Sequence, residues 1–242
     1  MARLTIRRLS AAVKRALGPS LVSCACAALL AASQLSAQQT TPADAARFVV
    51  VIDAAHGGDD PGGRLGSGQP EKAFTLALGV RLRSLLAARG MQVVTTRESD
   101  TSIDLDRRAE IANRANAQAC LSLHASESGS GMHLFVSSLA PTEPARFVAW
   151  KTAQSAWVTR SLALAGVVNS SLLRSGMKVT LGRTSLLAVD SMACPALAIE
   201  VAPERTADHK TTAALDNPEY QARVAGVLAA ALLQWRAEVP KP

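Results

Sequence analysis

The stretch VVIDAAHGGDD, residues 50–60, is the clearest structural signal in this chain of 242 residues. Val and Ile fill positions 49–52, which is typical of a strand buried on both faces of a sheet. The glycines after His56 leave no room for more strand, so this imidazole is expected in a loop at the strand's carboxyl end. Open α/β sheets bind ligands at that end. A lone loop histidine is more often held by ordinary hydrogen bonds, so partners for His56 must come from elsewhere.

Helical and strand-like segments alternate along the rest of the chain. The expected helices cover residues 71–89, 104–117, 144–174 and 218–235, and the later strands cover residues 91–96, 120–124, 132–137, 184–189 and 196–201. Gly90 is placed to end the first helix, and a break in the long third one is expected near Ser161 or Gly166. This order predicts one α/β domain with a largely parallel or mixed twisted sheet of about five to six strands and helices on both faces.

The first 37 residues have the composition of an export signal. A basic segment precedes the apolar residues 21–32, a run too short to span a membrane. Arg7 and Arg8 leave both the general and the twin-arginine export routes open. We therefore predict a signal peptide over 1–37, a tether over 38–46, a folded catalytic domain over 47–237 and a tail over 238–242. The mature protein is expected in the periplasm or cell envelope, with no integral membrane segment.

The formal net charge of +7 does not indicate a nucleic-acid partner, because it is unevenly distributed. Five of the 26 basic residues lie in the first 37 residues, where there is no acidic residue. The remaining charges nearly balance. No nucleic-acid-binding face is therefore expected.

Two cysteines, Cys120 and Cys194, remain once the signal is removed. In an oxidising compartment they can form a disulfide, although both begin strand-like apolar runs and suit buried free thiols equally well. Their spacing is not that of a zinc knuckle. We do not expect them to bind metal.

Four residues share a position that suits catalysis. His56, His124 and Glu200 stand at the carboxyl ends of expected strands, and Glu71 begins the helix that leaves the first loop. Two imidazoles and one carboxylate form a ligand set of catalytic zinc, with a position left for water. A further carboxylate is then needed as a base. Taken alone, Glu71 is better explained by the helix dipole, which favours a carboxylate in the first turn.

The sequence lacks the local signatures of several other enzyme classes. There is no H-E-x-x-H helix, no G-x-S-x-G elbow, no phosphate-binding Walker loop and no G-x-G-x-x-G after the first strand. The other two histidines, His133 and His209, are explained by strand-surface and loop positions.

Several separated blocks of residues 48–235 resemble, in order and spacing, the zinc-dependent N-acetylmuramoyl-L-alanine amidases of the Amidase_3 type. They are VVIDAAHGGDDPGG, EKAFTLALGVRLRSLLAARGMQVVTTRESD, LDRRAEIANRANAQACLSLHAS, PALAIEVAPE and DNPEYQARV. The resemblance implies that His56, Glu71 and His124 bind one catalytic Zn²⁺ and that Glu200 is the catalytic carboxylate. It also implies hydrolysis of the amide between the lactyl group of N-acetylmuramic acid and the first L-alanine of the peptide stem, in wall remodelling or daughter-cell separation.

The chain departs from the family pattern near three of these residues. Ala54-Ala55 replaces Pro-Gly before His56, and Ser126 replaces Asn after the second histidine motif. The usual Gly-Phe after the catalytic glutamate is replaced within Val201-Ala202-Pro203, which alters the expected contour on the substrate side. No ligand is removed by these changes.

Three further residues are secondary candidates. Glu204 competes with Glu200 as the base, although Glu200 is the one aligned with the motif. Asp53 either orients a ligating imidazole or caps the loop. Arg97 is more typical of a structural ion pair than of a substrate clamp.

The expected partner is peptidoglycan, and no separate wall-binding module is seen beside the catalytic domain. The segment 140–161, with Trp150 and Trp157, is either a surface for a protein activator or an ordinary packed helix. A monomer is expected. A zinc peptidase acting within the stem and a wall-binding protein without activity are the competing interpretations.

Overall fold

The computed structural model describes residues 48–143 and 149–239, and the structural statements below concern these residues. The predicted signal peptide, tether and the end of the tail lie outside the described residues, so these boundaries stay predictions. Within the described part of the chain, no helix has both the length and the apolar character needed to cross a membrane.

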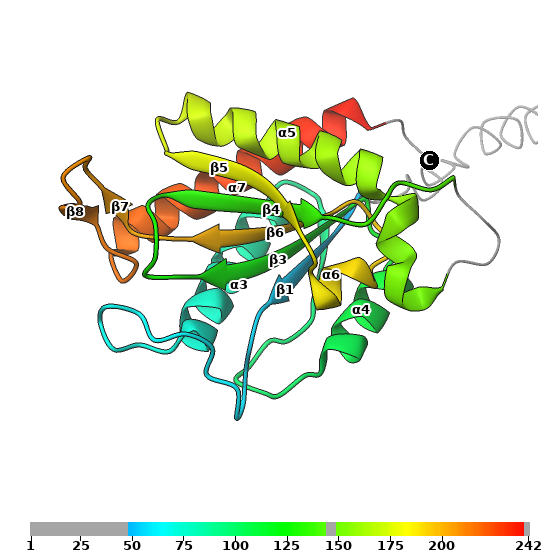
Figure 1. The fold of residues 1–242 in the computed structure, drawn as a ribbon, viewed down its shortest axis with the longest axis horizontal. Coiled ribbons are helices and arrows are strands. Elements are labelled where there is room, and N and C mark those ends of the chain that lie inside the picture. The colour runs from blue at the N-terminus through cyan, green and yellow to red at the C-terminus, as the bar shows by residue number, and fades with distance from the viewer. Residues whose placement is uncertain (1–47, 144–148, 240–242) are drawn as a thin grey trace, which may run out of the picture. The chain divides into compact units, whose positions relative to one another are not determined.

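A six-stranded sheet forms the centre of the domain in the order β2-β1-β3-β6-β4-β5 (Figure 1). Its strands are β1 (Val49–Ala54), β2 (Gln92–Thr95), β3 (Ala119–Ala125), β4 (Met132–Ser137), β5 (Val179–Thr184) and β6 (Ala196–Val201). Every neighbouring pair is parallel except β4 with β6. The predicted mixed, largely parallel sheet is confirmed, and β1, β3 and β6 present their carboxyl ends at one edge.

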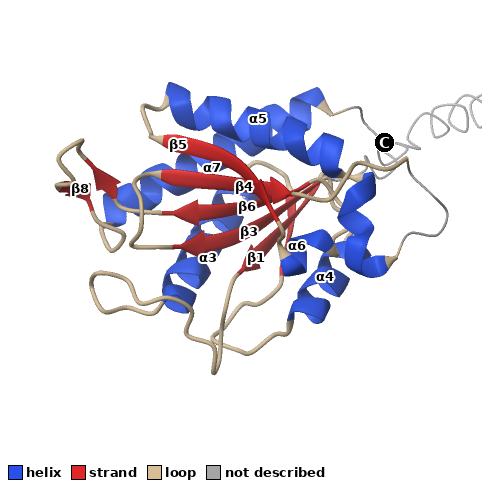
Figure 2. Ribbon diagram, in the orientation of Figure 1, coloured by secondary structure: helices blue, strands red, loops and turns tan. Residues whose placement is uncertain are grey.

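Helices cover both faces of this sheet, as predicted (Figure 2). One face carries the long helices α3 (Glu71–Ala87), α5 (Val158–Arg174) and α7 (Pro218–Glu238). The other carries α4 (Leu105–Arg114), the 3-10 helix η2 (Trp150–Ala156) and the one-turn α6 (Leu187–Asp190). Val50 and Ile52 pack into the first core and Val51 into the second, as the alternation of side chains along a strand requires.

The end of α3 shows how the local sequence sets an element boundary. Gly90 has a φ of 74°, and the N–H groups of Gly90 and Met91 donate to the carbonyls of Ala87 and Leu86. This is the Schellman pattern with glycine at C′, which satisfies carbonyls that the helix leaves free. The predicted helix end is confirmed.

The predicted strand over residues 184–189 is wrong. The strand is β5 (Val179–Thr184), and the apolar residues after it form α6 because the Asp190 carboxylate accepts the N–H of Leu186 (3.0 Å) and the hydroxyl of Ser185 (3.2 Å). A side chain that bonds its own backbone in this way favours a turn over an extended strand.

The break in the long helical segment lies between η2 and α5 at Trp157, not at Ser161 or Gly166. The hydroxyl of Ser161 donates to the buried Gln154 side chain, whose amide in turn donates to the Met192 carbonyl (2.7 Å). Ser161 therefore ties α5 to η2 instead of interrupting the helix.

Two features were beyond the sequence-based predictions. A small hairpin of β7 (Glu204–Arg205) and β8 (Thr211–Ala213) follows β6 directly. Cys120 and Cys194, 74 residues apart, form a disulfide with a Cα–Cα distance of 6.3 Å. The disulfide lies in the second core, beside the start of β6. This resolves the choice that the sequence left open between a bridge and two free thiols.

Candidate metal centre

His56, Glu71 and His124 converge at the edge where β1 and β3 end. Each offers one ligand atom, and these three atoms lie within 4.8 Å of one another. His56 Nε2 is 3.1 Å from Glu71 Oε2, and His124 Nδ1 is 3.1 Å from Glu71 Oε1. The imidazole rings stand nearly perpendicular, with centroids 5.5 Å apart. The sheet and the first helix thus bring three of the predicted residues into one group that could hold a metal ion.

Glu71 forms the buried base of this group, and only 7% of its side chain is exposed. It stands in the first turn of α3, and its carboxylate accepts N–H groups from Gly63 (2.9 Å) and Ala125 (3.0 Å). Burial by itself raises the pKa of Glu71, but the hydrogen bonds from His124, His56 and these two backbone groups outweigh it and hold the pKa well below its usual range. The carboxylate therefore stays charged and able to bind a cation.

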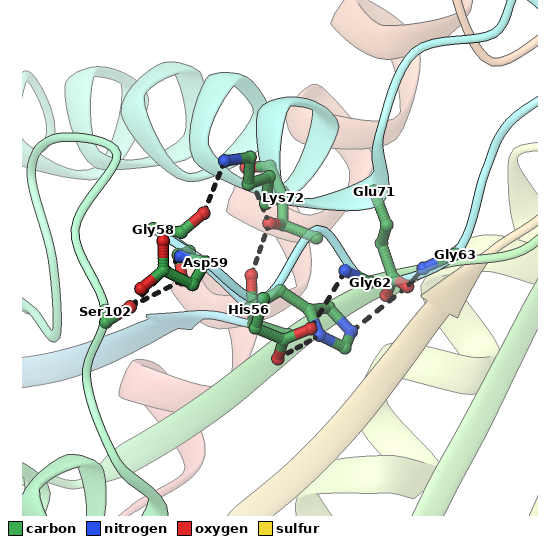
Figure 3. A network of polar contacts seen from close by, with 12 residues as sticks. His56, Gly58, Asp59, Gly62, Gly63, Glu71, Lys72 and Ser102 are labelled. Atoms are coloured by element: carbon green, nitrogen blue, oxygen red, sulfur yellow. Dashed lines mark hydrogen bonds and ion pairs between the residues drawn. The ribbon is translucent and has the colours of Figure 1, made fainter.

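His56 is held in an unusual backbone conformation, with a φ of 62°. Its Nδ1 faces Asp60 Oδ2 at 2.8 Å. Its Nε2 faces Glu71, as Figure 3 shows. The bond to Glu71 raises the pKa of His56, burial lowers it, and Asp60 raises it again, so the net shift is upward. Asp60 was not among the predicted residues. Its position four residues after His56 in a glycine-rich loop was the only signal in the sequence.

The donor set fits a zinc ion. Zinc bonds of about 2.0 to 2.1 Å in a tetrahedron place neighbouring ligand atoms roughly 3.3 Å apart. His56 Nε2 and His124 Nδ1 each lie 3.1 Å from a different oxygen of Glu71, which is close to that edge length. Three protein donors of nitrogen and oxygen type also match an open catalytic site better than a closed structural one. The more exposed imidazole, that of His124, leaves this side of the group accessible, with 37% of its side chain exposed.

A buried polar network holds the backbone at His56, one of the three residues of the candidate metal centre. Arg108 donates from NH1 to Asp53 Oδ1 and to the Ala54 carbonyl, both at 2.7 Å, and from NH2 to the His56 carbonyl at 2.7 Å. Arg97 donates to the carbonyls of Ala54 and Ala55. The strained turn at His56 is therefore fixed by guanidinium groups that satisfy its carbonyls.

Asp53 and Arg97, two of the secondary candidates, are both part of this buried hydrogen-bond network. Asp53 accepts from Thr96 (2.7 Å), Arg108 and Ser122 (2.8 Å), and the Ser122 hydroxyl is 3.5 Å from His124 Nε2. Asp53 thus reaches the His124 ring through Ser122 and the His56 carbonyl through Arg108. Arg108 was missed because a single arginine on an amphipathic helix normally faces solvent.

Glu200 is placed beside His124 by the register of the sheet. The parallel pairing of β3 with β6 matches His124 with Glu200, and the antiparallel pairing of β4 matches His133 with Glu200 on the other side. The Glu200 side chain is half-buried and has no hydrogen bond or ion pair among the described residues. Glu204, the competing candidate, instead pairs with Arg223 of α7 at 2.5 Å.

Packing in the core does not account for both tryptophans of the segment 140–161. The Trp150 side chain is 49% exposed on η2, and Trp157 is half-buried at the start of α5. His133 bonds Thr180 across to β5 (2.8 Å), and His209 is exposed at the tip of the β7–β8 hairpin.

A family model described as N-acetylmuramoyl-L-alanine amidase, Amidase_3, matches residues 50–234. The chain belongs to this family. The match covers the six-stranded sheet except Val49, the first residue of β1, and all but the end of α7. The similarity predicted from the sequence motifs is thereby confirmed.

Individual family members match shorter parts of the chain. The N-acetylmuramoyl-L-alanine amidase Rv3717 of Mycobacterium tuberculosis is 35% identical over 125 residues, covering 41% of this chain and 52% of that protein. AmiA of Escherichia coli is 42% identical over 77 residues, covering 32% of this chain and 27% of that protein. The chain thus spans about half or less of the length of these relatives.

Solved structures extend the likeness to the fold. The N-acetylmuramoyl-L-alanine amidase AmiC2 of Nostoc punctiforme superposes with a TM-score of 0.60 at 25% identity, covering 79% of this chain and 98% of that one. The mixed α/β domain seen here is therefore the domain of this amidase family.

Proposed function

We propose that this protein is a zinc-dependent N-acetylmuramoyl-L-alanine amidase that cleaves the amide between the lactyl group of N-acetylmuramic acid and L-alanine in peptidoglycan. The convergence of His56, Glu71 and His124, with Glu200 next to His124 in the sheet, is the observation that carries the proposal. Membership of the amidase family supports it.

In this proposal His56, Glu71 and His124 hold the ion. When bound, zinc supplies Lewis acidity toward the scissile carbonyl and toward water. Glu71 contributes a carboxylate that remains ionised because four hydrogen bonds oppose the effect of burial on its pKa. Asp60 orients the imidazole of His56 through Nδ1. Such orienting carboxylates commonly raise the affinity of a histidine site for metal.

Glu200 is the general base and acid in this scheme. Its carboxylate accepts a proton from the attacking water and returns it to the nitrogen of L-alanine as the amide breaks. The side chain is free for this role because no described residue pairs with it, whereas Glu204 is held by Arg223. The products are an N-acetylmuramic acid carboxylate and a peptide with a new L-alanine amino terminus.

We infer that the protein acts after export, in the periplasm or cell envelope. The composition of residues 1–37 supports this, and so does the Cys120–Cys194 disulfide, because disulfides persist mainly in oxidising compartments. A protein activator and a monomeric state stay predictions, and the exposed Trp150 side chain is compatible with a contact surface on η2.

Product analysis tests the reaction. Purified peptidoglycan and soluble muropeptides are digested with zinc-loaded protein, and the products are identified by mass spectrometry and amino-terminal labelling. The proposal expects intact stems with a free L-alanine amine. Cleavage within the stem would instead establish a peptidase, and the absence of any cleavage with retained wall binding would establish a binding protein.

Matched variants test the residue roles. Glu200→Gln is expected to lower kcat by about 10²- to 10⁴-fold with zinc retained, the usual range for loss of a general base. Glu204→Gln should keep kcat within about threefold, because a surface ion pair contributes little. His124→Ala should lose stoichiometric zinc in metal analysis while His133→Gln keeps it. Full hydrolysis by Glu200→Gln, or full zinc content in His124→Ala, contradicts the assignment.

A further inference from the structure

A positively charged hollow lies near the proposed active site and has no role in the scheme above. It encloses about 480 Å³ between three segments: the loop after β3, the start of β5 and the β7–β8 hairpin. Gly129 and Ser130 line it from the loop, Lys178 from the residue before β5, and Arg205 and His209 from the hairpin. These segments are far apart in the sequence but adjacent in the fold.

The polar side chains that line the hollow are cationic or neutral. The Lys178 ammonium donates to the Arg205 carbonyl at 2.5 Å, and an ammonium group has further donors to offer. His209 is exposed at a φ of 63°, and its ring has no hydrogen bond among the described residues. No carboxylate lines the hollow.

Three acidic residues lie near the hollow, and two of them are in ion pairs. Glu127 accepts the Gly66 N–H at 2.6 Å and lies 3.5 Å from the Arg205 guanidinium. Glu204 pairs with Arg223 on α7. Asp208, exposed in the hairpin, accepts the Thr206 hydroxyl and forms no ion pair among the described residues. Lys178 likewise forms no ion pair there, so its charge is available to an anion that enters the hollow.

Two short connections link the hollow to the proposed active site. Gly129 packs on His133, so closely that a Cβ added to Gly129 would lie 2.5 Å from His133 Nε2, and His133 is the cross-strand partner of Glu200. Gly129, which lines the hollow, follows His124 by five residues, and a chain reaches at most about 3.5 Å per residue. The hollow therefore begins no more than about 17 Å from His124, and Gly129 packs directly on the strand position opposite Glu200.

We propose that this hollow binds a free carboxylate of the peptide stem and so selects stems that carry one beyond the first alanine. The inference rests on the proposed function. Two residues of an extended peptide span about 7 Å, so the carboxylate of the second stem residue falls within the limit just given. The carboxylate would accept hydrogen bonds from Lys178 and His209, while Arg205, partly engaged by Glu127, would add to the field. The hairpin would therefore act in substrate specificity without touching the scissile bond.

The test compares two muropeptides that differ only at the second residue of the stem. In one this residue has a free carboxylate, and in the other the same carboxyl group is amidated. Zinc-loaded wild type should hydrolyse the acidic stem with a kcat/KM about three- to tenfold higher, mainly through a lower KM. Lys178→Met should remove most of this preference, and His209→Gln part of it. Lys210→Met changes a lysine beside His209 that does not line the hollow, and it should leave the ratio unchanged.

The ratio separates recognition from a structural effect. If Lys178 only anchored the hairpin through the Arg205 carbonyl, Lys178→Met would slow both substrates equally and leave the preference intact. That result, or equal kcat/KM of wild type on both stems, overturns the inference while the amidase activity stands. Failure of wild type to release either stem overturns the proposed function, and this inference with it.

Discussion

Glu127 contacts both the loop 57–70, through the Gly66 N–H, and the β7–β8 hairpin, through Arg205. The two segments are held in place by different kinds of contact. Residues 54–56, from which the loop begins, are held by buried guanidinium groups: Arg97 and Arg108 are each 4% exposed and donate to their carbonyls. The hairpin is attached by exposed or half-exposed contacts, among them Lys178 to the Arg205 carbonyl and Arg205 to Glu127. In Figure 1 the loop is cyan and the hairpin is orange.

This difference indicates a division of tasks between the two segments. Metal ligands must be held closely in place before the ion arrives, and a buried, fully bonded network provides that rigidity at the cost of sensitivity to mutation. A segment that only recognises the substrate tolerates surface contacts and sequence change. Departures from the family pattern occur beside both segments, at residues 54–55 and 126 near the proposed ligands and at residues 201–203 before the hairpin, but His56, Glu71 and His124 are all retained.

The largest expected effect is on the buried network. Arg108→Met leaves Asp53 as an uncompensated buried carboxylate, which typically costs about 3 to 5 kcal/mol in the free energy of unfolding. Arg107→Met, the neighbouring change at an exposed ion pair, should cost less than about 1 kcal/mol. Denaturant unfolding of the metal-free proteins measures both. Equal, small losses would show that the network does not support the loop.

A glycine in the same loop tests its packing around the proposed metal ligands. A Cβ on Gly62 would lie 2.6 Å from His56 Cδ2 and 2.8 Å from Glu71 Oε2, so Gly62→Ala should displace a ligand and weaken zinc binding by at least about tenfold. Gly68→Ala is the matched control, because Gly68 also has a positive φ but nothing within 4 Å. Competition with a zinc chelator measures both affinities. A similar loss in the two variants would point to backbone strain alone.

The contacts of Glu127, which connect the loop to the hairpin, should contribute less to the free energy of unfolding. Glu127→Gln keeps an acceptor for the Gly66 N–H but removes the charge facing Arg205, so the free energy of unfolding should fall by about 0.2 to 1 kcal/mol. Proteolysis within residues 206–210 should become faster, since the hairpin loses an attachment. Unchanged stability and cleavage would mean that Glu127 holds only the loop 57–70.

The smallest effect concerns the protonation of His56. Asp60 raises the pKa of His56, after the larger influences of Glu71 and burial, so Asp60→Asn should lower this pKa in the metal-free protein. A raised histidine pKa stabilises the metal-free fold at pH below its ordinary value, and the contribution is lost as the pH rises through the raised pKa. NMR titration of the His56 ring measures the shift, with Asp59→Asn as control. A rise in the pKa would contradict the assignment.

The elements with strong local signals were predictable. The expected strands at 132–137 and 196–201 match β4 and β6, and the helix beginning at Glu71 matches α3, because apolar periodicity and Gly90 mark them locally. The strand at 184–189 failed because an Asp190 carboxylate that bonds the preceding backbone overrides apolar composition. The β7–β8 hairpin has only five strand residues and carries almost no periodic signal.

The sequence by itself determined the family and the largely parallel sheet. It also determined the candidates His56, Glu71, His124 and Glu200, because each of these residues stands where a strand ends or a helix begins. Only the tertiary structure decided which groups meet. It shows that Cys120 and Cys194, 74 residues apart, form a disulfide, that Arg108 donates to the His56 carbonyl, and that Glu204 pairs with Arg223 of α7. The physical reason is that side-chain pairing depends on distances and burial set by the register of strands remote in the sequence. A local pattern fixes the strands but not which side chains come to face one another across them.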